Sequence, residues 1–140
     1  AEAPSVAPAE QAQEPEQAVF EGFALTLAAP EGSCRLHYDG AQAEGEVDLG
    51  IPPPCRFMRD RDDRPQFFAE EGRRLIAVVG GDLTENPADP LTRRPDCGHA
   101  MAGVAFADGT FVKTGYTMGP GVFCARMGLE QREIWLLLNG

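Results

Sequence analysis

Short apolar runs separated by turn residues recur along the chain from Val19 onward. Several alternate between apolar and polar positions, which is typical of strands with one buried face. The run Leu75–Val79 is apolar throughout and predicts a central strand. The segments with these patterns are 20–27, 34–38, 47–49, 66–69, 75–79, 100–107, 110–113, 122–126 and 133–138. Together they predict a mainly β protein, a small antiparallel β-sandwich or barrel-like domain.

Two segments allow a more local prediction. Asp108-Gly109 stands between two alternating runs and is the strongest hairpin signal in the chain. Residues 127–138 fit a terminal helix or a turn followed by a strand. Gly128 and the bulky Ile134-Trp135 pair favour the turn and strand.

Residues 1–18 consist almost entirely of Ala, Pro, Gln and Glu and differ from the rest of the chain. Such a segment has too little apolar surface to offset its ordering entropy, so we expect a disordered acidic tail. Residues 19–140 then form a single domain. The tail is either a tether, for example to a lipid-modified cysteine upstream, or a terminus without a role of its own.

The four cysteines Cys34, Cys55, Cys97 and Cys124 form an even set without a Cys-x-x-Cys pair. In a short exported chain this pattern predicts two disulfides. Three connectivities are possible, and we expect nearest neighbours, Cys34–Cys55 and Cys97–Cys124. Each would stabilise the fold by roughly 3–4 kcal/mol on the chain-entropy model. Four buried free thiols in a cytosolic protein are the alternative.

The sequences around the second and fourth cysteines resemble each other. Cys-Arg-Phe-Met at 55–58 and Cys-Ala-Arg-Met at 124–127 each precede a charged turn and an apolar pair. This similarity suggests two related β units, each with its own disulfide.

The net charge of -10 argues against nucleic acid or an anionic membrane as a partner. No stretch approaches the roughly 18 apolar residues that a membrane span needs. The first residue is Ala1, which fits removal of a signal peptide. Lys113 is the only lysine among 12 basic side chains, a bias that fits a GC-rich bacterial genome. We therefore expect a secreted protein of the bacterial periplasm or cell exterior.

Motifs for catalysis and cofactor binding are weak, so the sequence favours a non-enzymatic protein and predicts no cofactor. Ser33 lacks the context of a nucleophile elbow. The stretch 60–71 imitates a calcium loop but has Arg64 and Pro65 at the fifth and sixth positions. The glycines after 76–79 lack a following helix for a dinucleotide site. A pair of carboxylates acting as acid and base stays open.

Metal binding is an alternative hypothesis. Zinc could use two thiolates and two imidazoles, from Cys34, His37, Cys97 and His99. Copper could use His99 and Met101, which alternate on one predicted strand, with His37 as a further ligand. Disulfide formation would remove the zinc site, because it consumes the thiolates.

The long segment between Gly80 and Asp96 is the main candidate for a binding surface, since long loops in compact domains are often functional. The candidate binding residues are Asp82, Glu85, Asp89, Arg93 and Arg94. A second arginine cluster, interleaved with aspartates, comprises Arg56, Arg59, Arg61 and Arg64. We expect an exported protein-binding module, more specifically an inhibitor or immunity-type protein acting on an envelope or periplasmic protein. The alternatives are a copper- or zinc-binding protein and a structural component of an envelope assembly.

Overall fold

The computed structural model describes residues 16–82 and 96–140. The first sheet is an antiparallel meander in the order β1-β2-β3-β4. Its strands are β1 (Glu16–Phe20), β2 (Phe23–Ala28), β3 (Arg35–Asp39) and β4 (Glu44–Asp48). The second sheet has the order β10-β9-β7-β5, with β6 also pairing with β7. Its strands are β5 (Cys55–Phe57), β6 (Phe68–Glu70), β7 (Arg73–Gly80), β9 (Ala100–Ala107) and β10 (Thr110–Met118).

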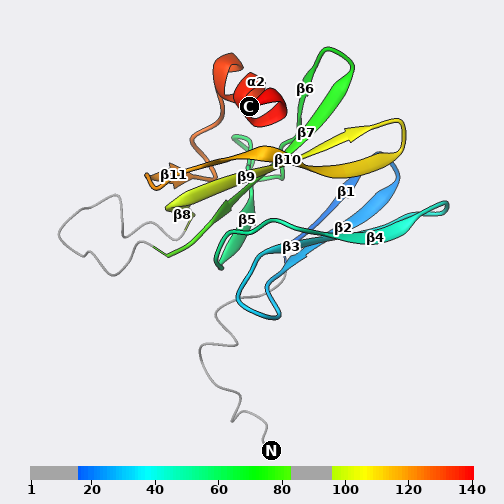
Figure 1. The fold of residues 1–140 in the computed structure, drawn as a ribbon, viewed down its shortest axis with the longest axis horizontal. Coiled ribbons are helices and arrows are strands. Elements are labelled where there is room, and N and C mark those ends of the chain that lie inside the picture. Colours follow the sequence, from blue (N-terminus) through cyan, green and yellow to red (C-terminus); the bar gives the residue numbers. More distant parts are fainter. Residues whose placement is uncertain (1–15, 83–95) are drawn as a thin grey trace, which may run out of the picture.

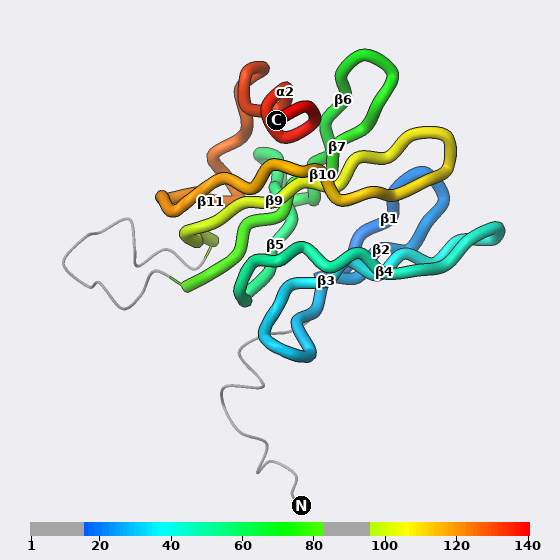
Figure 2. The backbone as a smooth tube through the Cα atoms, in the orientation of Figure 1, coloured from blue at the N-terminus to red at the C-terminus, as the bar shows by residue number. Residues whose placement is uncertain are grey.

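Two short elements and one helix complete the described chain. β8 (Cys97–Gly98) pairs with β11 (Phe123–Cys124), and α2 (Gln131–Asn139) follows β11. The elements stack in three layers, with the first sheet, the second sheet and α2 in succession (Figures 1 and 2). The mainly β, antiparallel architecture predicted from the sequence is confirmed. No helix among the described residues has the length and apolar character needed to cross a membrane.

The second sheet is buried on both faces, and β7 shows why its sequence is apolar throughout. Ile76 and Val78 point into the core between the two sheets. Leu75, Ala77 and Val79 point to the opposite side, into a second core with the helix residues Ile134, Leu137 and Leu138. Successive strand residues face opposite sides, so a strand between two cores needs apolar residues at every position. The predicted central strand is confirmed.

Three hairpins in the fold use the same two-residue turn, a carboxylate residue followed by glycine with positive φ at both positions. Asp108 (φ 54°) and Gly109 (φ 76°) join β9 to β10, as the sequence predicts. Residues 21–22 join β1 to β2, and residues 71–72 join β6 to β7.

Both predicted disulfides form, Cys34–Cys55 and Cys97–Cys124, and no described cysteine is free. The first joins the chain just before β3 in the first sheet to β5 in the second. The second joins β8 to β11. The two cysteine blocks therefore do not mark equivalent β units, because one disulfide bridges two sheets and the other spans a single two-stranded pair.

Two sequence-based boundaries are corrected by the structure. Residues 16–18, assigned to the tail, belong to β1 and pair with 25–27 of β2. The C-terminal segment is a helix, so the prediction of turn and strand is wrong. The backbone N–H of Glu130 donates to the Glu133 carboxylate at 2.8 Å, which satisfies a donor at the helix start. Ile134, Leu137 and Leu138 have helical spacing and face the second sheet.

Candidate binding site beside the Cys97–Cys124 disulfide

The chain on either side of residues 83–95 is held together at one end of the second sheet. The His99 N–H donates to the carbonyl of Gly80 at 3.0 Å. Gly98 packs directly on Gly80, since a β-carbon at position 98 would lie 2.3 Å from the Gly80 carbonyl oxygen. A side chain at position 98 would therefore push apart the two backbone segments from which residues 83–95 extend.

Asp96 and the second disulfide fix the neighbouring segment 124–126. Cys97 lies opposite Cys124 in the β8–β11 register, and the disulfide joins them there. The Asp96 carbonyl accepts the N–H of Ala125 at 2.8 Å, and its carboxylate accepts the N–H of Arg126 at 3.3 Å. β8 and β11 are too short to fix segment 124–126 by their own backbone pairing. The disulfide and the hydrogen bonds to Asp96 make this segment rigid.

Arg56 on β5 interacts electrostatically with acidic residues, among them Asp96 next to the Cys97–Cys124 disulfide. Burial lowers the pKa of its guanidinium, and the carboxylates of Glu16, Asp96 and Asp82 oppose that shift. Its Nη1 atom is buried without a hydrogen-bond partner among the described residues. Asp82 and Asp96, which flank residues 83–95, thus act on one shared cation.

The charged stretch after β5 forms a closed turn. The Asp60 carboxylate accepts the backbone N–H groups of Asp62 at 2.9 Å and Arg64 at 3.0 Å. These hydrogen bonds lower the pKa of Asp60, the Arg64 bond most strongly, against a smaller opposing effect of burial. Asp63 adopts a positive φ of 64° in this turn. The stretch imitating a calcium loop is therefore a turn stabilised by its own backbone donors.

Arginine side chains connect this turn to the disulfide-bonded segment. Arg59 donates to the Asp63 carbonyl at 2.9 Å and pairs with Glu16 at 3.0 Å. Arg126 pairs with the Asp63 carboxylate at 3.0 Å. The backbone N–H of Arg59 also donates to the Ala125 carbonyl at 2.8 Å. Two segments far apart in sequence are thereby fixed beside each other.

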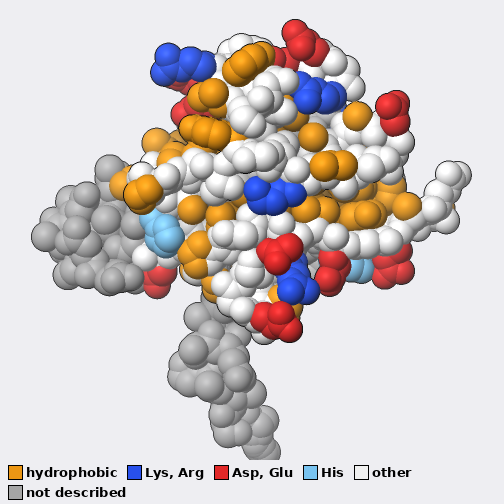
Figure 3. Space-filling model, viewed as in Figure 1, with side chains coloured by type: hydrophobic (Ala, Val, Ile, Leu, Met, Phe, Trp, Pro, Cys, Tyr) orange, Lys and Arg blue, Asp and Glu red, His pale blue; other side chains and the backbone are white. Residues whose placement is uncertain are grey.

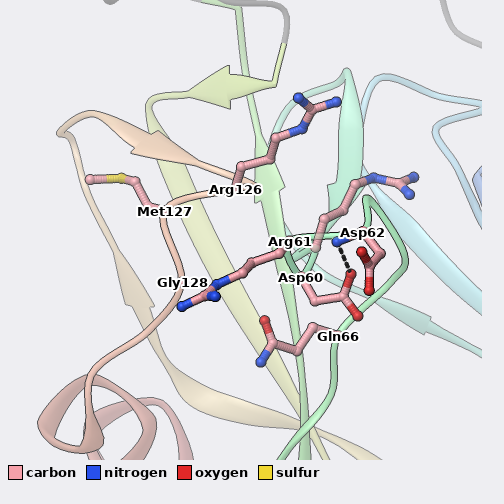
Figure 4. Close-up of a pocket in the computed structure, with 8 residues that line it drawn as sticks. Asp60, Arg61, Asp62, Gln66, Arg126, Met127 and Gly128 are labelled. Carbon is pink, nitrogen blue, oxygen red and sulfur yellow. Dashed lines mark hydrogen bonds between the residues drawn. The ribbon is translucent and has the colours of Figure 1, made fainter.

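An open cleft of about 590 Å³ lies between them. Figure 4 shows side chains from both segments around it. The lining residues are Arg59, Asp60, Arg61, Asp62, Gln66, Arg126, Met127 and Gly128. Met127 is 63% exposed. Arg61 is exposed and, in the described part of the chain, makes no hydrogen bond or ion pair. The cleft thus presents the unpaired guanidinium of Arg61 and the largely exposed side chain of Met127, whose sulfur accepts the N–H of Cys124 at 3.3 Å.

The structure locates only part of the candidate surface named from the sequence. Asp82 is exposed and does not line the cleft. Glu85, Asp89, Arg93 and Arg94 lie outside the described residues. Two of the four arginines in the second cluster, Arg59 and Arg61, line the cleft, and the Asp63–Arg126 ion pair joins their turn to the opposite wall.

The predicted metal ligands are not assembled into one site. The zinc hypothesis is wrong in its four-ligand form, because Cys34 and Cys97 are both in disulfides. His37 on β3 pairs with Glu44 at 3.0 Å. His99 packs over Gly81 before β9. Figure 3 shows the histidines as two separate pale-blue areas. Within the described ranges, the one group of three potential ligands is Asp96, Cys97 and Cys124, whose sulfurs are bonded to each other.

Comparison of the chain with protein-family models, with curated proteins and with solved structures finds no match. The candidate site therefore rests on its own geometry. Acidic and basic side chains are interspersed on the visible face in Figure 3, without a broad basic area.

Proposed function

We propose that the protein is an exported, non-enzymatic binding module that contacts another protein through the cleft between residues 59–66 and 125–128. The finer form of the proposal is an inhibitor or immunity-type protein acting in the bacterial periplasm or outside the cell. Two disulfides support an oxidising compartment, since such bonds are rare in the cytosol.

The observation that carries the proposal is that Arg61 and Met127 line the same cleft. Both side chains are exposed, and the backbone beneath them is fixed by the Cys97–Cys124 disulfide and the Asp63–Arg126 ion pair. Arginine and methionine are enriched in protein interfaces. A preorganised frame lowers the ordering cost of binding.

A structural role in an envelope assembly would use the same surface but leave the partner's activity unchanged. Metal handling has weaker support, because the cysteines are paired and Met101 is buried against α2. Activity of the partner with and without this protein separates inhibition from assembly.

The proposal is tested by affinity capture from an envelope extract with the immobilised wild-type protein and two variants. Arg61→Ala removes a side chain that supports nothing else in the described structure. Arg132→Ala, on the exposed side of α2, is the matched control. We expect one protein to be captured by wild type and Arg132→Ala and reduced at least about fivefold with Arg61→Ala. Equal capture by all three would contradict binding through the cleft.

A further inference from the structure

A second hollow lies at the other end of the sandwich, where three reverse turns converge. These are the β1–β2 turn at 21–22, the β3–β4 turn at 40–43 and the β9–β10 turn at 108–109. In Figure 1 they lie on the side opposite β8 and β11. The hollow has a volume of about 550 Å³ and is open to solvent. Because its walls come from both sheets, its shape depends on how the whole sandwich packs.

Aromatic rings form the floor of this hollow. Phe23 and Phe106 line it and are each half-buried. Phe111 supports both, with ring centroids 4.9 Å from Phe23 and 4.7 Å from Phe106. Tyr38 stacks on Phe111 at 4.3 Å. The floor is thus part of a packed aromatic cluster.

Gly40 sets how closely the β3–β4 turn approaches this floor. A β-carbon at position 40 would lie 2.6 Å from the Phe23 ring. The turn therefore rests on the ring, and the hollow is preformed.

The rim carries negative charge. Glu21 and Asp108 are the only charged side chains among the lining residues, and both are acidic. Glu21 pairs with Arg74. Asp108 forms no hydrogen bond or ion pair in the described part of the chain, and its side chain is exposed. An unpaired carboxylate and aromatic rings that line the same hollow form a combination that attracts an organic cation, because ring faces carry negative partial charge.

We propose that this three-turn hollow binds the basic side chain, lysine or arginine, of a partner protein. The alkyl part of such a side chain would pack on Phe23 and Phe106, and its charged end would approach Asp108. A metal ion is a poor occupant, since no group of three ligand atoms forms here among the described residues. The protein's charge of -10 favours the approach of a basic partner. This site is separate from the cleft and goes beyond the function proposed above.

The test is an NMR titration of the full chain with N-acetyl-lysine methylamide, following the amides of Phe23, Gly40, Phe106 and Gly109. N-acetyl-norleucine methylamide is the matched ligand, since it has the same carbon chain without the charge. We expect saturable millimolar binding of the lysine compound, at least about fivefold tighter than the norleucine compound. Asp108→Asn should weaken lysine binding about two- to fivefold, while asparagine keeps the positive-φ turn intact.

Equal binding of the two ligands would overturn the proposal, as would the absence of saturable shifts with either. Unchanged lysine affinity in Asp108→Asn would also overturn it. Phe106→Leu provides a second variant, expected to weaken binding about fivefold while the amides of β7 keep their wild-type shifts.

Discussion

Gly98 lies against the backbone of Gly80, so closely that the carbonyl oxygen of Gly80 occupies the space of any β-carbon at position 98. The obstructing atoms belong to the backbone and cannot move aside as a side chain can. The contact therefore holds β8 against the end of β7.

Gly98→Ala is therefore expected to destabilise the protein by about 2–3 kcal/mol, because backbone must shift to admit the methyl group. Gly115→Ala is the matched control. There the nearest atom to a β-carbon is the Gly140 carbonyl oxygen at 3.6 Å, an ordinary contact. We expect this variant within about 0.5 kcal/mol of wild type. Urea unfolding measures both, and equal effects would contradict the close approach at Gly98.

Removing the Cys97–Cys124 disulfide by a double alanine substitution should lower the free energy of unfolding by about 3–4 kcal/mol. Removing Cys34–Cys55 should cost a similar amount, since the separations of 27 and 21 residues are close. The two variants should differ in amide exchange. Ala125 should lose protection relative to Val78 only when Cys97 and Cys124 are replaced, because its N–H bonds to Asp96 beside that disulfide. Equal relative protection in both variants would contradict this local role.

A helix over residues 131–139 buries different side chains from a strand over the same residues. Substitution of two neighbouring leucines therefore tests the helix. In α2, Leu137 is fully buried and Leu136 is only half-buried. Leu137→Ala should cost about 3 kcal/mol, because it opens a cavity against the second sheet. Leu136→Ala should cost less than half of that. A strand would bury positions 134, 136 and 138, so the reverse order in urea unfolding would support a strand.

The Asp60 turn should make stability depend on pH in a defined direction. The folded-state pKa of Asp60 lies below its ordinary value of 3.8. Its contribution is therefore complete above the unfolded-state pKa and is lost as the pH falls through the folded-state pKa. Asp60→Asn should be less stable than wild type at pH 7, and the difference should shrink in acid.

Asp62→Asn is the control for that experiment. Asp62 pairs with Arg64 but accepts no backbone N–H group in the described part of the chain. Its substitution should change the pH profile of unfolding much less than Asp60→Asn does. A difference at Asp60 that stays constant from pH 7 into acid would contradict the backbone hydrogen bonds.

Much of the fold could be predicted because its signals are local. The uniform apolar character of β7, the Asp108-Gly109 turn and the even cysteine set each reflect a nearby physical requirement. The helix α2 was missed because its evidence lies in the spacing of Ile134, Leu137 and Leu138 against a sheet whose position the sequence does not reveal. The hairpin turns at 21–22 and 71–72 were missed because glutamate is less common than aspartate or asparagine at positive φ.

The cleft could not be predicted, because it depends on contacts between distant segments. Arg126 and Asp63 are 63 residues apart in the chain. The sequence did mark the arginine cluster around Arg59 and Arg61, but it gave no reason to place that cluster beside Met127. The two segments are joined by the Asp63–Arg126 ion pair and by the hydrogen bond from the Arg59 N–H to the Ala125 carbonyl.

The most direct test of binding through the cleft is site-specific photo-crosslinking in envelope extract from two exposed apolar positions. Met127, in the cleft, is 63% exposed, and Val19, on the outer face of the first sheet, is 79% exposed. A photoreactive side chain is placed at one position or the other. We predict that the protein captured by wild type is crosslinked from position 127 and not from position 19. Crosslinking from position 19 alone, or from neither position, would contradict binding through the cleft.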